Sequence, residues 1–100
     1  MDIKEMQKTV YQNKLDKGFN VTDINKEFCL LYGEVAEAYE AWQKKEDDVG
    51  EELADIAIYL LGLAEILNID LYKEIERKIT INHDRKYETI NGVLKRVSDK

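Results

Sequence analysis

Two pairs of acidic side chains at helical spacing constrain this chain more than any other feature. Glu34 and Glu37 form the first pair, and Glu52 and Asp55 form the second. The members of each pair are three residues apart, so both carboxylates lie on one face of a helix. Between the pairs, residues 43–50 (QKKEDDVG) are polar and include a glycine, which favours a turn. The pattern predicts two helices that fold back on each other and bring four carboxylates together.

Four carboxylates in one small volume repel each other strongly. At about 5 Å and an effective dielectric constant of about 20, each like-charge pair costs roughly 3 kcal/mol. A marginally stable domain cannot remain folded against several such repulsions unless cations lie between the acids. Hard divalent metals with oxygen ligands, Mg²⁺ above all, suit carboxylates best. The four acids are therefore candidate metal ligands.

The apolar residues recur at helical spacing and predict an all-α framework. A first helix over residues 2–17 would end at Gly18, a suitable C-terminal cap. A second helix can begin at Thr22 or Asp23, both good N-terminal caps. We expect the core face of this second helix to carry its large apolar residues, which are Phe28, Leu31, Val35, Tyr39 and Trp42.

The third expected helix, residues 51–67, is apolar around almost its whole circumference. Such a helix is normally buried on every side, which one chain of this size cannot achieve, so the sequence predicts a homo-oligomer, a dimer or a tetramer. An aspartate in so apolar a helix is costly unless it is paired or metal-bound. Asp55 is thus harder to explain as an ordinary solvated acid than Glu34 or Glu37, in a chain of which 36% is charged.

A fourth helix is expected after Asp70, with Leu71, Ile75 and Ile79 facing inward. Its other edge would present Lys78, Asn82 and Arg85 at successive helical turns. After it, Asn91-Gly92 separates two short apolar runs and indicates a β-hairpin. We therefore expect one compact domain over residues 1–100, with four helices and a short C-terminal hairpin.

Composition narrows the classes of partner. Fifteen basic against twenty-one acidic side chains give a net charge of −6, the wrong sign for a protein that binds nucleic acid polymers. No signal region or membrane-spanning stretch is evident. The single Cys29 excludes an internal disulfide and indicates a buried thiol and a reducing, cytoplasmic setting. Clustered acids with a nearby cationic edge suit a small polyanion bridged by metal, such as a nucleoside triphosphate.

These residues resemble the all-α MazG-like nucleotide pyrophosphohydrolases, whose signature is ExxE, a spacer and ExxD. The signature stands here as EVAE at residues 34–37 and ELAD at residues 52–55. It lies inside the family-like strings GEVAEAYEAW and EELADIAIYLLGLAEILNIDL, and the similarity extends from NKLDKGFN to KITINHDRKY. The resemblance covers most of the chain up to about Tyr87.

The resemblance implies hydrolysis of nucleoside triphosphates to monophosphates and pyrophosphate, in the service of nucleotide-pool sanitising. It implies Mg²⁺, with Mn²⁺ as a substitute, at the four acids. By position, Lys78, Asn82 and Arg85 resemble the family's phosphate-contacting residues. The base and sugar pocket of such proteins lies between the first two helices and is often completed by a second subunit. The residues suggested for it here are Asn13, Lys14, Phe19 and Trp42, although Trp42 also fits an ordinary packing role.

Two other functions compete with this interpretation. A ferritin-like dimetal protein would also use glutamates from a helical bundle, but it needs Glu-x-x-His pairs on two helices. No histidine follows Glu34 or Glu52 at that spacing. The remaining alternative is a non-enzymatic interaction module whose apolar third helix serves assembly alone.

Overall fold

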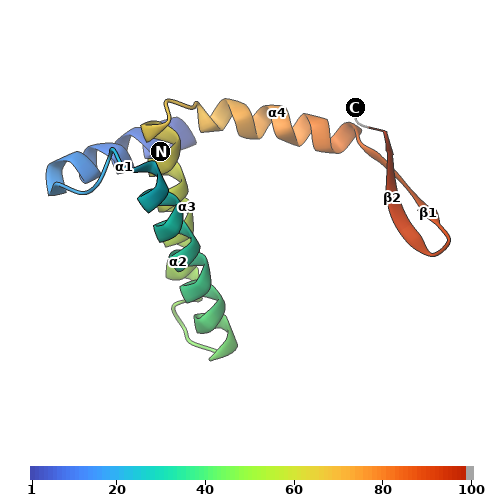
Figure 1. The fold of residues 1–100 in the computed structure, drawn as a ribbon, viewed down its shortest axis with the longest axis horizontal. Helices are drawn as coiled ribbons and strands as arrows, with labels where there is room; N and C mark the ends of the chain where they lie inside the picture. Colours follow the sequence, from blue (N-terminus) through green and yellow to red (C-terminus); the bar gives the residue numbers. More distant parts are fainter. Residues whose placement is uncertain (99–100) are drawn as a thin grey trace.

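The structure, a computed structural model, describes residues 1–98 and confirms the expected order of elements (Figure 1). Four helices are followed by a two-stranded antiparallel sheet. The helices are α1 (Ile3–Lys17), α2 (Ile24–Gln43), α3 (Val49–Ile66) and α4 (Leu71–Asp84), and the strands are β1 (Lys86–Ile90) and β2 (Val93–Ser98).

Local sequence signals explain where the helices begin and end. Asp2, Asp23 and Asp70 each cap a helix by accepting a hydrogen bond from a backbone N–H three residues later. Gly18 ends α1 in the left-handed conformation, with φ of 73°. The hairpin turns at Asn91-Gly92, both with positive φ, as the dipeptide predicts.

The first three helices form the body of the molecule, which we define as residues 1–70. α2 and α3 lie side by side after a sharp turn, and α1 crosses α3 near its C-terminal end (Figure 1). Small side chains let α2 approach α3 closely, and the buried hydrophobic residues are Ala38, Ala41, Leu61, Leu63 and Ala64.

The remaining elements form an arm, residues 71–98, that extends away from this body (Figure 1). Its main contact with the body is between α4 and α1. The radius of gyration is 17.2 Å, whereas a compact chain of 100 residues has about 13 Å. The predicted four helices are confirmed, but the predicted compactness is wrong for the single chain.

The predicted core face of α2 is also wrong. Tyr39 and Trp42 are 59% and 65% exposed, and Phe28 and Val35 are exposed as well. The small residues Ala38 and Ala41 are buried instead, because alanines at the contact let two helix axes approach more closely than large side chains allow. The large side chains are left on the outer face of α2.

The single chain has too few elements to cover all of its apolar surface, as the sequence predicted for the third helix. α3 is buried at Leu61 to Ala64 but exposes Leu53, Ile58 and Leu60. Cys29 is exposed rather than part of the core. Within residues 1–98, no helix is long and apolar enough to cross a membrane.

Candidate metal and nucleotide site

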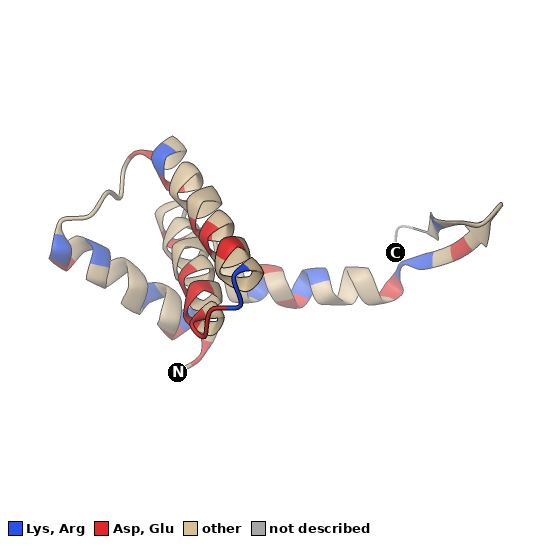
Figure 2. Cartoon of the chain, turned by 90° about the horizontal axis from the view of Figure 1, so that it is seen from below, with Lys and Arg blue, Asp and Glu red and all other residues tan. Residues whose placement is uncertain are grey.

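The turn between α2 and α3 brings acidic side chains from both helices together. One carboxylate oxygen from each of Glu34, Glu37 and Glu52 lies within 4.8 Å of the others. Figure 2 shows the acidic segments gathered along this helix pair and its connecting turn. Asp55 lies outside the 4.8 Å group and is exposed, so its expected burial in an apolar helix is wrong. Its charge nevertheless acts on Glu34 and Glu52.

Two of these carboxylates have oxygens that nothing in the described chain satisfies. Oε2 of Glu34 and Oε2 of Glu52 are both shielded from solvent and accept no hydrogen bond. Buried acceptors in proteins are normally paired with a donor, a water or an ion. Negatively charged acceptors that converge from two helices fit a hard cation, which binds carboxylate oxygens.

The electrostatics of the cluster agree with its geometry. Burial is the first cause of the raised pKa of Glu34, and the negative charges of Glu37 and Asp55 follow. Burial also comes first in raising the pKa of Glu52, followed by the charges of Asp48 and Glu37. Both groups thus hold a proton more readily than an isolated carboxyl, as expected for acids that repel each other.

A first prediction concerns the stability of the metal-free protein as a function of pH. Because the folded-state pKa of Glu34 is above its ordinary value of 4.5, the native state binds more protons than the unfolded state between these two values. The contribution of Glu34 to the free energy of unfolding should therefore become less favourable as pH rises through that window. Thermal melts in EDTA at several pH values, compared with Glu34→Gln, measure this contribution.

The parent should gain stability relative to Glu34→Gln as pH falls from 7 towards 4.5. Parallel curves for the two proteins would contradict the prediction. Added Mg²⁺ should reverse the trend in the parent, because protons and metal compete for the same oxygens.

A cavity of about 320 Å³ lies between α1 and α3. Asn13, Lys14 and Phe19, three of the residues suggested for a base and sugar pocket, line it together. The full lining of this cavity consists of Thr9, Val10, Asn13, Lys14, Phe19, Ile58 and Tyr59. Lys14 and Phe19 also line a neighbouring cavity together with Glu27 and Leu30 of α2, so the suggested pocket between the first two helices stays a prediction.

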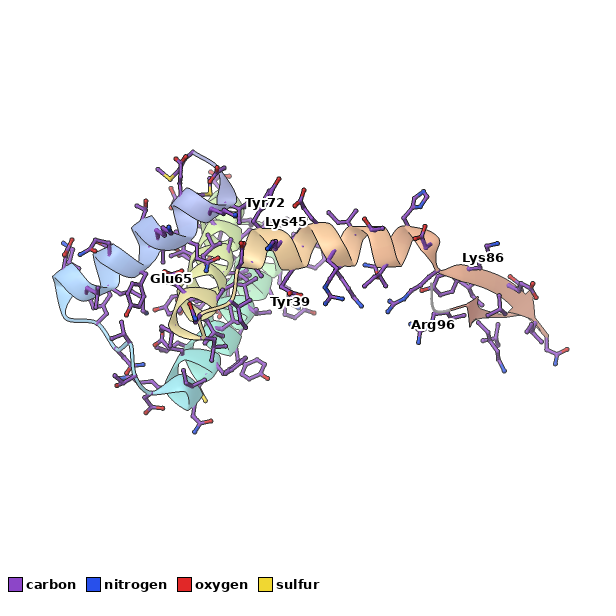
Figure 3. The ribbon with its side chains drawn as sticks, turned by 90° about the horizontal axis from the view of Figure 1, so that it is seen from above. Tyr39, Lys45, Glu65, Tyr72, Lys86 and Arg96 are labelled. Carbon is purple, nitrogen blue, oxygen red and sulfur yellow. The ribbon has the colours of Figure 1, made fainter. Side chains whose placement is uncertain are left out.

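Trp42, the fourth suggested pocket residue, is not part of this cavity. It stacks on Tyr39 with ring centroids 6.2 Å apart, and both rings are on the exposed face of α2. Figure 3 shows the Tyr39 side chain projecting from α2 on the side of the body from which α4 extends. Because Trp42 is 65% exposed, the role in core packing that the sequence also allowed for it is wrong for the single chain.

Tyr59 connects the cavity to the acidic cluster. Burial raises its pKa first, and the charges of Glu34, Glu27 and Asp55 raise it further. It follows Asp55 by one helical turn on α3, and this spacing is the sequence signal that could have placed it in the site. The acids and the cavity are therefore neighbouring parts of one surface.

An ion pair that the sequence did not reveal forms one wall of the cavity. Nζ of Lys14 lies 2.5 Å from Oε1 of Glu27, and the two side chains are 11% and 1% exposed. Asn20 donates to the other Glu27 oxygen at 3.1 Å. The ammonium also lies 5.6 Å from the centre of the Tyr59 ring. Gly62 makes room for this arrangement, because a Cβ there would lie 3.3 Å from Cδ of Lys14.

The expected phosphate-contacting residues lie on α4 and at its C-terminal cap, Arg85, remote from the acids of the same chain (Figure 1). Lys78 is exposed. Arg85 donates to Oδ1 of Asn82 at 3.0 Å, and its Nε is shielded from solvent without a partner among the described residues. The structure thus brings Asn82 and Arg85 together but does not bring α4 to the acidic cluster.

Comparison with known proteins places this architecture. None of the curated proteins searched matches the sequence. Among solved structures, the chain is similar to a MazG-like pyrophosphohydrolase of cyanophage S-2L bound to dGDP and three catalytic Mn²⁺ ions per active site, with a TM-score of 0.71 and 21% identity. The match covers 98% of this chain and 99% of that one. The model of the MazG-like family matches residues 17–99, and the chain therefore belongs to the MazG-like family.

Proposed function

We propose that this protein is a metal-dependent nucleotide pyrophosphohydrolase that converts a nucleoside or deoxynucleoside triphosphate to its monophosphate and pyrophosphate. The observation that carries the proposal is the pair of shielded, partnerless oxygens of Glu34 and Glu52, beside Glu37. A pure assembly surface gives no reason to concentrate such acceptors. The activity named for the cyanophage protein of the same fold supports the same reaction.

In this proposal Glu34, Glu37, Glu52 and Asp55 hold Mg²⁺, for which Mn²⁺ can substitute. A bound divalent metal would supply a water of lowered pKa and neutralise phosphate charge. By holding that metal, the carboxylates would set the position of the α-phosphate relative to the water. The oxygen of the attacking water would form a new bond to the α-phosphorus and release a proton, while the bond from the α-phosphorus to the oxygen that bridges the α and β phosphates breaks. Pyrophosphate leaves with the electrons of the broken bond. The cavity beside Tyr59 would take the nucleoside, with Asn13 as its polar contact.

We further propose that the working protein is a homo-oligomer in which the arm of one copy reaches the acidic cluster of another. Residues 71–98 hold seven basic and four acidic side chains, whereas residues 1–70 hold seven basic and sixteen acidic ones. Arm and body are thus oppositely charged, which favours their association between copies. The exposed outer face of α2 offers apolar surface for the same contact. The arm has no core of its own, so we treat the chain as one domain.

A second prediction tests the arm. Lys78→Ala should lower turnover, because a charge-assisted contact to phosphate is worth about 1.5 to 3 kcal/mol. Metal binding by the acids should persist, and calorimetric titration with Mn²⁺ measures it directly. Unchanged turnover would remove α4 from the site.

Mixing two variants with lowered activity decides whether the arm acts between copies. A mixed dimer of Lys78→Ala and Glu52→Gln subunits contains one site with intact acids and an intact lysine, so random mixing should restore about a quarter of the parent activity. If each site uses its own arm, mixing restores nothing. Sedimentation of the parent as an 11.7 kDa monomer at micromolar concentration would refute the oligomer.

The deciding assay for the activity is Mg²⁺-dependent release of pyrophosphate from a panel of canonical and modified nucleotides. Activity towards modified bases would support a sanitising role. The alternative of an interaction module predicts no release from any nucleotide. We also propose a reducing, cytoplasmic location, supported by the free and exposed thiol of Cys29.

A further inference from the structure

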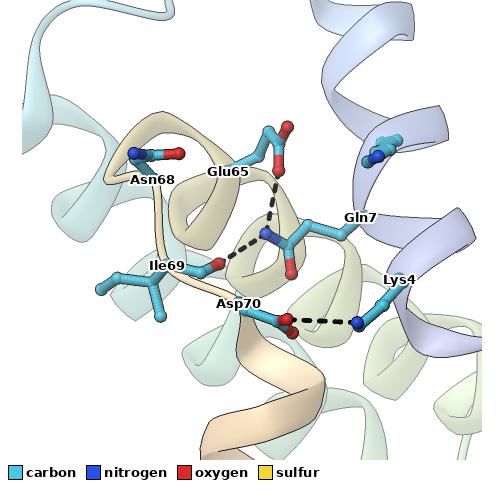
Figure 4. Close-up of a pocket in the computed structure, with 7 residues that line it drawn as sticks. Lys4, Gln7, Glu65, Asn68, Ile69 and Asp70 are labelled. Atoms are coloured by element: carbon cyan, nitrogen blue, oxygen red, sulfur yellow. Dashed lines mark hydrogen bonds and ion pairs between the residues drawn. The ribbon is translucent and has the colours of Figure 1, made fainter.

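We infer that Gln7 is a positioning residue that sets the direction in which the arm leaves the body. Gln7 lies on α1 and is only 5% exposed. Its Nε2 donates to Oε1 of Glu65 at 3.0 Å and to the carbonyl oxygen of Ile69 at 2.7 Å, as Figure 4 shows. Its Oε1 accepts from the backbone N–H of Leu71 at 3.4 Å.

These partners belong to three successive parts of the chain. Glu65 is in the last turn of α3, Ile69 is in the link, and Leu71 is the first residue of α4. The first N–H groups of a helix have no partner within the helix, so the Gln7 amide supplies what this junction lacks. A single side chain of α1 therefore connects the end of α3 to the beginning of α4.

The other contacts at the junction are weaker. Lys4 lies 3.3 Å from Asp70, but their side chains are 53% and 38% exposed, and exposed ion pairs contribute little. The same ammonium lies 5.8 Å from the centre of the Tyr72 ring, at the surface. Gln7 is the buried member of this set, and buried hydrogen bonds are the ones that hold a unique geometry.

A small change of angle at the Gln7 junction would move the far end of the arm by a large distance. The effect of this movement on activity rests on the proposed exchange of arms between copies. Arg85 lies fourteen residues beyond Leu71, about 21 Å along the helix axis. A rotation of about 15° at the junction would therefore move Arg85 by roughly 5 Å, more than a charge-assisted hydrogen bond tolerates. Gln7 would thus control delivery of the arm's cations without touching substrate.

The test compares Gln7→Met, of similar length but without the amide, with Gln12→Met as the matched control. Gln12 is exposed on the same helix, and its amide donates to Oδ1 of Asp16. Spin labels at the native Cys29 and at His83→Cys report the angle between body and arm, since the His83 side chain is 86% exposed. Dilution with unlabelled protein restricts the measurement to distances within one chain.

The parent and Gln12→Met should give the same narrow distance distribution, and Gln7→Met should give a broader or shifted one. For Gln7→Met, the protein concentration that gives half-maximal turnover per subunit should rise at least about tenfold. An arm without a fixed direction loses more conformational freedom when two copies associate, which weakens their association. Gln7→Asn, which keeps an amide on a shorter side chain, serves if Gln7→Met does not fold, and it should shift the distance in the same direction.

An unchanged distance distribution in the folded Gln7 variants overturns the inference, whatever the activity. A monomeric or inactive parent refutes the proposed function instead, and the label distances still decide the role of Gln7. Calorimetric titration with Mn²⁺ should give equal metal affinity for parent and Gln7→Met, since Gln7 lies far from the acidic cluster. A loss of metal binding would show a general structural defect and would also count against the inference.

Discussion

Glu52→Gln is expected to lower nucleotide turnover by at least about 100-fold, more than the loss of an outer-sphere partner of a metal ligand usually costs. A glutamine at this position keeps the shape of the side chain but is a neutral and poorer ligand for a hard cation. The metal-free variant should be as stable as the parent or more stable. The substitution removes a negative charge that lies beside Glu34 and Glu37, on a carboxylate whose Oε2 has no hydrogen-bond partner.

Thermal melts in EDTA and in Mg²⁺, run beside the pyrophosphate-release assay, measure both effects. Glu51→Gln is the matched control, because Glu51 is the adjacent, exposed glutamate outside the 4.8 Å group. Asp55→Asn should change activity and stability in the same directions as Glu52→Gln. A structural glutamate would behave in the opposite way, with lower stability in EDTA and an unchanged response to Mg²⁺, and that result would exclude Glu52 from the metal site.

Lys14→Met is expected to destabilise the protein by about 3 to 5 kcal/mol, the usual cost of leaving a buried charge without its partner. The Glu27 carboxylate is 1% exposed, so water cannot replace the ammonium. The neighbouring Asn20 amide would remain, but one neutral donor does not balance a buried negative charge. This is the largest stability effect that the described contacts predict.

Chemical denaturation of four proteins separates the pair from its parts. Glu27→Leu alone should also be destabilising, whereas the double variant Lys14→Met with Glu27→Leu should recover much of the loss, since buried ion pairs can often be replaced by apolar residues. Lys8→Met, at an exposed lysine of the same helix, should change little. Additive losses in the double variant would show that the two side chains act independently.

The sequence was sufficient for local structure and for predicting that three of the four candidate metal ligands lie together. Helix caps at Asp23 and Asp70, the glycine at position 18 and the Asn91-Gly92 turn depend on interactions within a few residues, which the sequence contains directly. The acidic pairs likewise needed only helical spacing and one turn to bring Glu34, Glu37 and Glu52 together.

Tertiary structure decided which faces pack and which long-range partners meet. The large side chains of α2 indicated a core face, but close packing of helix axes selected Ala38 and Ala41 instead. No spacing rule relates Lys14 to Glu27, or Gln7 to Ile69, because their contacts depend on how α1 crosses the other helices. The direction of the arm is decided in the same way. Sequence periodicity describes one helix at a time, whereas these features arise from the packing of several.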